Sequence, residues 1–272
     1  MNTSASTPIS CPVRIIPRLD IKVPNVIKGI HLEGLRVVGN PGELAQRYYQ
    51  QGADEIIYMD VVASLYGRNS ILSAVRTAAE RIFVPLTVGG GIRSIDNIVA
   101  ALRSGADKVA INTQAIHDPT FLAEAARTFG SQCLTLSVEA KRRKDGRWEA
   151  LTDNGREKSG LDVIEWVERA EQLGVGEILL TSVDAEGTQE GFDVELIHSV
   201  RERVSIPVIG CGGAGNEGHV ATMIENSGCD AVSCASIFHY GLCDIVSVKN
   251  ALAARGIEVR SSDGAPVDGH AI

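Results

Sequence analysis

Two carboxylates, each followed closely by a lysine, are the residues of this chain best suited to acid–base chemistry. Asp20 lies two residues before Lys22, and Glu139 lies two residues before Lys141, each directly after a short apolar run. Two carboxylates in one site act as general acid and general base when their surroundings separate their pKa values. A single Asp in such a position is often only a turn residue, so the prediction depends on the pair.

Glycine-rich segments form a second group of candidates. Gly89, Gly90 and Gly91 follow one apolar run, and Gly212 and Gly213 follow another. Glycines let the backbone approach a ligand closely, and N–H groups released there and at a helix start bind phosphate. Small polar residues after two further runs complete the pattern, namely Asn112, Thr113, Ala235 and Ser236. The glycines alone could serve tight turns, but their duplication favours an elongated ligand with a phosphate at either end.

Charged residues also stand at or near the beginnings of four apolar runs. They are Arg14, Glu55, Lys108 and Glu177. If their side chains point to a common interior, two acids and two bases form a neutral ionic ring. Such a ring is a salt-bridge plug or a set of solvated strand ends, or it gates the passage of a small polar molecule.

The sequence shows no residue pattern for nucleophilic catalysis or for metal binding. The six histidines are scattered over predicted loops and helices, and the six cysteines show no C-x-x-C pairing. No nucleophile–base triad and no metal-ligand spacing is apparent. We therefore predict no covalent Ser or Cys catalysis, no metal and no cofactor.

The elements that must position these residues alternate regularly. Eight short β-branched runs are predicted as strands, at 13–19, 55–59, 83–88, 108–111, 133–138, 177–181, 207–209 and 231–234. Amphipathic helical segments lie between them, among them 41–51, 94–103, 118–129, 162–173 and 193–204. Strict alternation with strands apolar on both faces indicates a parallel sheet.

The chain also repeats itself about 122 residues apart. The segment 52–60 resembles 174–182, 84–93 resembles 206–215, and 104–110 resembles 227–233. An open doubly wound sheet would satisfy the alternation, but eight units with a twofold repeat favour a single closed (β/α)8 TIM barrel over residues 13–260. We expect residues 1–12 to be a flexible N-terminal segment and 261–272 a polar C-terminal tail.

Two longer excursions interrupt the alternation, at 21–40 and 140–159. The second is predicted as a β-hairpin with its turn at 144–147, where the sequence reads Lys-Asp-Gly-Arg. Long loops after barrel strands are commonly lids or substrate-contacting arms.

Composition narrows the function classes. The net charge of −8 and a pI near 5.3 argue against a nucleic-acid partner. No stretch approaches 18 apolar residues, and the N-terminus has neither a basic nor an apolar leader region, which indicates a cytoplasmic chain without a membrane partner.

From about residue 13 to 260 the chain resembles HisF, the family of cyclase subunits of imidazole glycerol phosphate synthase. Matching stretches include Arg14–Lys22, Val88–Ile92, Gly105–Thr113, Gly176–Asp184 and Gly212–Gly215. The related isomerase family HisA shares the half-barrels and the phosphate motifs, but the wording of these stretches resembles HisF.

The resemblance implies a lyase-type glutamine amidotransferase, a heterodimer with a HisH-like glutaminase. Ammonia would pass the ring of Arg14, Glu55, Lys108 and Glu177 and attack the ribulosyl bisphosphate PRFAR, giving imidazole glycerol phosphate and AICAR in histidine biosynthesis. By position Asp20 and Glu139 match the catalytic aspartates. Substrate or phosphate contacts are implied at Lys28, Thr181, Glu186 and Gly187 as well as at the glycine-rich segments, and Asp107 matches a residue that communicates with the glutaminase.

This chain departs from the family pattern at four positions. Glu139 and Glu186 each stand where the family has Asp, Arg18 where it commonly has Cys, and Cys211 where it commonly has Ser. We expect Arg18 to lie on the opposite face of its strand from Asp20. The longer side chain at 139 leaves an alternative open, a HisF-like paralogue that supplies ammonia for amidation of a surface-glycan sugar. A third possibility is a barrel that serves only as an allosteric scaffold.

Overall fold

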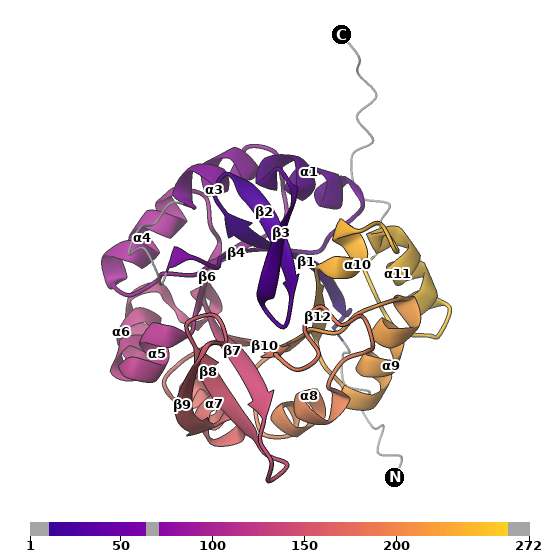
Figure 1. Ribbon diagram of the computed structural model, residues 1–272. Coiled ribbons are helices and arrows are strands. Elements are labelled where there is room, and N and C mark those ends of the chain that lie inside the picture. Colours follow the sequence, from indigo (N-terminus) through magenta and orange to yellow (C-terminus); the bar gives the residue numbers. More distant parts are fainter. Residues whose placement is uncertain (1–10, 64–70, 261–272) are drawn as a thin grey trace, which may run out of the picture.

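In the computed structural model, which describes residues 11–63 and 71–260, eight parallel strands close into a barrel (Figure 1). Each strand pairs with its neighbour around the barrel, and β7 pairs with β10 to complete the circle. The barrel strands are β1 (Arg14–Lys22), β4 (Ile56–Asp60), β5 (Leu86–Gly89), β6 (Lys108–Ile111), β7 (Leu134–Arg142), β10 (Glu177–Ser182), β11 (Val208–Cys211) and β12 (Ala231–Cys234). The predicted (β/α)8 barrel is thereby confirmed. Residues 1–10 of the expected flexible segment and the expected polar tail lie outside the described residues.

Helices surround the barrel on its outside (Figure 1). They are α1 (Pro41–Gln50), α3 (Leu72–Ala79), α4 (Ile95–Arg103), α5 (Thr113–His117), α6 (Thr120–Phe129), α7 (Val163–Gln172), α8 (Val194–Arg201), α9 (Glu217–Ser227), α10 (Ser236–His239) and α11 (Ile245–Ala253), with a 3₁₀ turn η1 (Ser131–Cys133). Side chains of Asn40, Ser94 and Asp162 accept backbone N–H groups at the starts of α1, α4 and α7, as expected of capping residues. Within the described ranges, no helix has the length and apolar character needed to cross a membrane.

Both excursions are β-hairpins that extend barrel strands. β2 (Asn25–Ile30) and β3 (Glu33–Gly39) follow β1, and β8 (Trp148–Thr152) and β9 (Glu157–Asp162) follow β7, all in antiparallel pairing. The turn between β7 and β8 covers the expected residues 144–147, with Gly146 at φ 85°. The first hairpin has no such sequence signal, because its turn residues His31 and Leu32 are non-glycine residues at positive φ.

The interior of the barrel has its own apolar layer. Successive residues of a strand face opposite sides, and on β1 Ile15 packs in the large core beneath the helices while Ile16 joins a smaller cluster. That smaller cluster includes Ile57, Leu179 and Ile209 from three other strands. These residues fill the middle of the barrel, between polar groups at its two ends.

The half-barrel repeat is visible in the backbone itself. Gly90 and its counterpart Gly212 have φ values of 91° and 95°. A Cβ on Gly90 would lie 2.1 Å from the carbonyl oxygen of Asp60, so that position requires glycine. Asn112 and Ala235, which precede the short helices α5 and α10, have φ values of −126° and −125°. Each half therefore builds the same turn at the strand ends.

Candidate active site

Asp20 lies buried near the carboxyl end of β1, inside the mouth of the barrel. Its Oδ1 accepts a hydrogen bond from Arg18 Nε at 2.8 Å. Burial opposes ionisation, but the Arg18 guanidinium and the Lys28 ammonium outweigh it and hold the pKa of Asp20 below its ordinary value. Asp20 is therefore a carboxylate anion at neutral pH.

Glu139 occupies the corresponding position on β7 and has the opposite electrostatic character. It is buried, and its Oε2 accepts a hydrogen bond from Asn112 Nδ2. Burial raises the pKa of Glu139 to about 7, although Arg18 and Asn112 act in the other direction. The repeat thus places two carboxylates at the barrel mouth, one ionised and one able to gain or lose a proton near neutrality.

The first predicted phosphate segment lines a cavity at the ends of β4, β5 and β6. All four of its predicted ligand residues are in the lining, together with Glu139. They are Gly90, Gly91, Asn112 and Thr113. Helix α5 starts here without a side-chain cap, which leaves backbone N–H groups for a ligand.

The second predicted segment lines another cavity, at the ends of β1, β11 and β12. Asp20 belongs to this lining. The predicted ligand residues found with it are Lys28, Glu186, Gly187, Gly212, Gly213, Ala235 and Ser236. Helix α10 also starts without a side-chain cap. Each half-barrel therefore contributes one cavity and one carboxylate, which fits an elongated ligand.

Arg18 does not lie where the sequence interpretation put it. The guanidinium points into the barrel on the same face as Asp20, because residues two apart on a strand share a face. Its Nη1 donates to Thr181 Oγ1 at 3.1 Å, and the side chain is only 2% exposed. The expectation that Arg18 would face away was wrong. Thr181, predicted as a substrate contact, lines neither cavity and instead holds Arg18.

Lys28 is tied to the opposite side of the barrel mouth. Its Nζ forms a buried ion pair with Glu186, whose Oε2 also accepts the Leu32 N–H at 3.0 Å. The backbone N–H of His31 donates to the Glu186 carbonyl at 2.8 Å. The β2–β3 hairpin is thereby fixed to the segment after β10.

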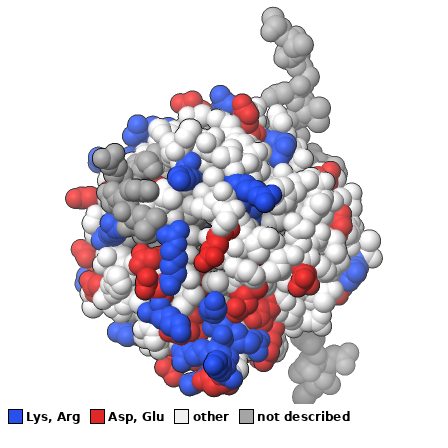
Figure 2. Space-filling view, in the orientation of Figure 1, with Lys and Arg blue, Asp and Glu red and all other residues white. Residues whose placement is uncertain are grey.

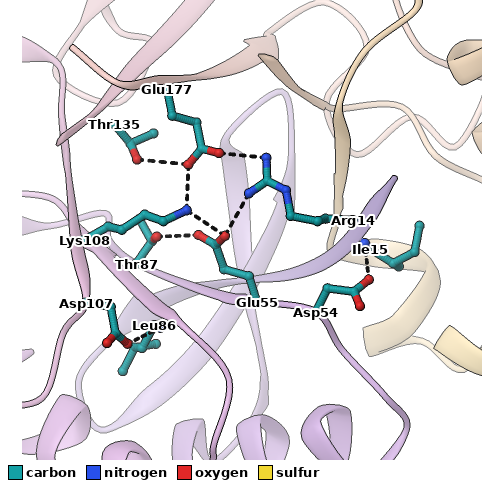
Figure 3. Close-up of polar contacts among 10 residues, drawn as sticks. All are labelled: Arg14, Ile15, Asp54, Glu55, Leu86, Thr87, Asp107, Lys108, Thr135 and Glu177. Atoms are coloured by element: carbon teal, nitrogen blue, oxygen red, sulfur yellow. Dashed lines mark hydrogen bonds and ion pairs between the residues drawn. The ribbon is translucent and has the colours of Figure 1, made fainter. Parts of the chain in front are cut away.

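The four charged residues at the strand beginnings do form a closed ring (Figure 3). Arg14 bonds Glu55 at 3.1 Å and Glu177 at 2.7 Å, and Lys108 Nζ lies 2.8 Å from Glu55 and 2.9 Å from Glu177. Burial opposes ionisation of Glu177, but Arg14 and Lys108 hold its pKa below the ordinary value. The ring closes the end of the barrel opposite the cavities, so these residues are not solvated strand ends.

Asp107, predicted at a partner interface, is exposed just outside this ring (Figure 3). Its Oδ2 accepts the backbone N–H of Leu86 at 2.8 Å. Asp54 and Asp230 make the equivalent bonds to Ile15 and Val208. The same hydrogen bond, from a backbone N–H to an aspartate side chain, therefore links neighbouring strands at each of these positions.

The sequence interpretation missed Asn154, which comes from the turn between β8 and β9 and lines the first cavity. The Asp-Asn-Gly run at 153–155 was a turn signal, but nothing in it indicated which cavity the turn would reach. Figure 2 shows Lys and Arg side chains gathered over β8 and β9 on this face. Asp and Glu side chains lie among them in the same view, and Arg142 and Arg147 are paired with acids. The patch is therefore a mixed network of charges.

These groups define what the site can do. Two glycine-lined cavities can hold two anionic groups, and the carboxylates between them can move protons. Across residues 11–63 and 71–260, no cluster of three or more His, Cys, Asp or Glu side chains could hold a metal ion. The geometry fits acid–base chemistry on a bisphosphate.

The chain is similar in sequence to a family of known proteins. Residues 14–244 match the family model described as histidine biosynthesis protein. The chain is 64% identical over 203 residues to imidazole glycerol phosphate synthase subunit HisF of Legionella pneumophila, covering 75% of this chain and 96% of that protein.

Two further HisF subunits extend the match over nearly the whole chain. Those of Bifidobacterium adolescentis and Mycobacteroides abscessus are each 50% identical, over 257 and 258 residues respectively, covering 93% of this chain and 100% of each relative. These names do not favour the alternative of a subunit for amidating a glycan sugar. The chain belongs to the HisF family, the cyclase subunits of imidazole glycerol phosphate synthase in histidine biosynthesis.

Proposed function

We propose that Asp20 and Glu139 are the acid–base pair with which this cyclase subunit acts as a lyase on PRFAR, yielding imidazole glycerol phosphate and AICAR. The observation that carries the assignment is the opposite tuning of the two carboxylates. Asp20 is held ionised by Arg18 and Lys28, whereas burial raises the pKa of Glu139 to about 7. Two groups separated in this way can respectively accept and donate a proton at one pH.

The ligand would lie across the barrel mouth with one phosphate in each cavity. Gly90, Gly91 and Thr113 would hold one phosphate, and Gly212, Gly213 and Ser236 the other, through backbone N–H groups and hydroxyls. The carbon skeleton then lies between Asp20 and Glu139. Attack of ammonia on its carbonyl requires a proton to leave nitrogen and another to reach the departing oxygen, which the two carboxylates would provide.

Ammonia would enter from the other end of the barrel. A HisH-like glutaminase would dock on the strand-start face around Asp107, as a heterodimer, and deliver ammonia to the ring of Arg14, Glu55, Lys108 and Glu177. Beyond the ring lies the apolar interior formed by Ile16, Ile57 and Leu179 among others. Neutral ammonia crosses such a layer more readily than ammonium, because a charge loses its hydration there. The ring must open for passage.

Turnover of PRFAR by the isolated chain tests the assignment. With ammonium salts at alkaline pH and no glutaminase, we expect imidazole glycerol phosphate and AICAR to form in equal amounts. Asp20→Asn and Glu139→Gln should each lower kcat about 10²-fold or more, the usual contribution of a positioned proton-transfer group. The matched control is Asp118→Asn, on the exposed turn between α5 and α6. No detectable turnover by the unmodified chain would refute the proposal.

A further inference from the structure

Arg18 is a buried cation at the centre of the barrel whose contacts reach beyond its effect on the charge of Asp20. On β1 the residues facing the interior are Arg14 in the ring, Ile16 in the apolar layer, Arg18, and Asp20 at the mouth. Arg18 is 2% exposed. A guanidinium loses its hydration at such a position, so its retention needs specific partners.

The guanidinium spans the barrel from one wall to another. Its Nε bonds Asp20 Oδ1 on the same strand at 2.8 Å, and its Nη1 bonds Thr181 Oγ1 on β10 at 3.1 Å. Cys211 Sγ on β11 lies 3.9 Å from Nη1. The contacts to β10 and β11 fix the direction of the guanidinium, and the Nε–H in turn fixes the Asp20 carboxylate.

Other charged groups near Asp20 do not provide the same contact. Lys28 on β2 is engaged by Glu186. His239 at the end of α10 is uncharged at neutral pH, since burial lowers its pKa to about 4. Glu139 on β7 is itself an acid, and the charge of Asp20 raises its pKa. Arg18 is the cation for which the described residues show a direct hydrogen bond to Asp20.

We propose that Arg18 is a positioning residue of the cyclase site, which holds the Asp20 carboxylate in one orientation and leaves Glu139 to carry the proton of the pair. This inference rests on the proposed function of the two carboxylates. Without Arg18, the buried Asp20 would lose its principal cation and would take up a proton at higher pH. The pKa of Asp20 would then lie closer to that of Glu139, and the separation that lets one carboxylate accept a proton while the other donates one would shrink.

The first test titrates Asp20 directly. Carboxyl ¹³C NMR on chain labelled at aspartate, with the Asp20 signal assigned by its loss in Asp20→Asn, should show a midpoint below that of free aspartate. In Arg18→Met the midpoint should rise by about one pH unit or more, the usual effect of a neighbouring arginine. Arg18→Lys should reverse most of the rise, and Arg103→Met, at the exposed end of α4, should cause none. An Asp20 midpoint unchanged in Arg18→Met would overturn the inference.

The second test follows the reaction. The rate of ammonia-dependent turnover is measured against pH at a constant concentration of uncharged ammonia. In Arg18→Met the rate should show an additional decline on the acid side of the pH profile, and Arg18→Lys should bring the profile back to that of the wild type. If Arg18→Met does not fold, Arg18→Gln replaces it, because it too removes the charge.

The outcomes separate the two proposals. Turnover with parallel pH profiles in wild type and Arg18→Met would overturn the role of Arg18 alone. Absence of turnover in the wild type at every pH would overturn the assignment of the two carboxylates, and with it this role for Arg18.

Discussion

Glu139 makes a contribution to stability that depends on pH. Its carboxyl is buried and has a pKa of about 7, against an ordinary value of 4.5. In the unfolded chain it ionises at the ordinary value, so between these pH values the folded state binds the proton more tightly. The contribution of Glu139 to stability therefore declines as pH rises from about 4.5 to about 7 and stays low above it.

Replacing Glu139 by glutamine should remove this pH dependence. Glutamine can still accept the Asn112 hydrogen bond but carries no charge. We expect Glu139→Gln to become more stable relative to the wild type as pH rises from 5 to 8, by a change of about 3 kcal/mol. Chemical denaturation at both pH values measures it.

The control for this experiment is Glu124→Gln, an exposed position on α6. Its stability relative to the wild type should be nearly the same at the two pH values. If the difference between Glu139→Gln and the wild type is also independent of pH, Glu139 does not titrate near neutrality.

At the residue scale, the sequence located the carboxylates but not what surrounds them. Asp20 and Glu139 were recognisable because the repeat places both after strands that face each other. Strand alternation places Arg18 on the same face as Asp20, because the two residues are two apart. The expectation that Arg18 faces away did not apply this rule and was wrong. Its bond to Thr181, 163 residues later, depends on barrel closure, which no local pattern contains.

Among the elements, the β2–β3 hairpin depends on a contact outside itself. Its strands are paired, but β3 is mostly exposed, and Val37 is 65% exposed. Two-stranded hairpins are marginal on their own in water. Glu186 holds this one to the barrel by accepting from Lys28 and from the Leu32 backbone.

Neutralising Glu186 should loosen the hairpin. In Glu186→Gln the buried Lys28 ammonium loses its counterion, and we expect amide hydrogen exchange across residues 25–39 to accelerate about 10-fold or more. Hydrogen exchange followed by mass spectrometry gives the rate for each segment.

Glu157→Gln, at an exposed site on β9, is the matched control and should leave exchange in both hairpins unchanged. Equal exchange of residues 25–39 in Glu186→Gln and the wild type would show that backbone pairing alone holds the hairpin.

Element boundaries illustrate what local patterns can and cannot predict. The strand expected at 108–111 is observed as β6 over the same residues. Its ends are easy to predict, because the apolar run lies between the end of helix α4 and the start of helix α5. The strand expected at 83–88 begins only at Leu86. Phe83 was included in the predicted strand because it is hydrophobic. The side chain is 79% exposed, so it does not belong to the core.

For the whole molecule, the two ends of the barrel have different surfaces. The mouth carries the cavities and the patch of mixed charge over β8 and β9, whereas the strand-start face carries the ionic ring, Asp107 and Phe83. A large exposed aromatic side chain is typical of residues that anchor a protein interface. Under the proposed function, that face is where the glutaminase docks.

Phe83→Asp should therefore weaken binding of the glutaminase about 10-fold or more, in keeping with the loss of an aromatic anchor. Isothermal titration of the two purified subunits measures the affinity. Val37→Asp, on the hairpin at the opposite end, also changes an exposed apolar side chain and should bind as the wild type does. Ammonia-dependent turnover by Phe83→Asp should stay unchanged. Equal affinities for the two variants would contradict docking over Phe83.

The polar contacts that join β1 to β10 also set an order of events during synthesis. Arg18 meets Thr181 across 163 residues, and Arg14 meets Glu177 on the same pair of strands. At roughly 5–20 residues per second, translation separates these partners by about 8–30 s. The first strand leaves the ribosome with both arginines before their acceptors on β10 exist. The charged interior therefore cannot be completed before β10 has been synthesised, and a nascent chain halted before β10 would lack both the closed ring and the central guanidinium bridge.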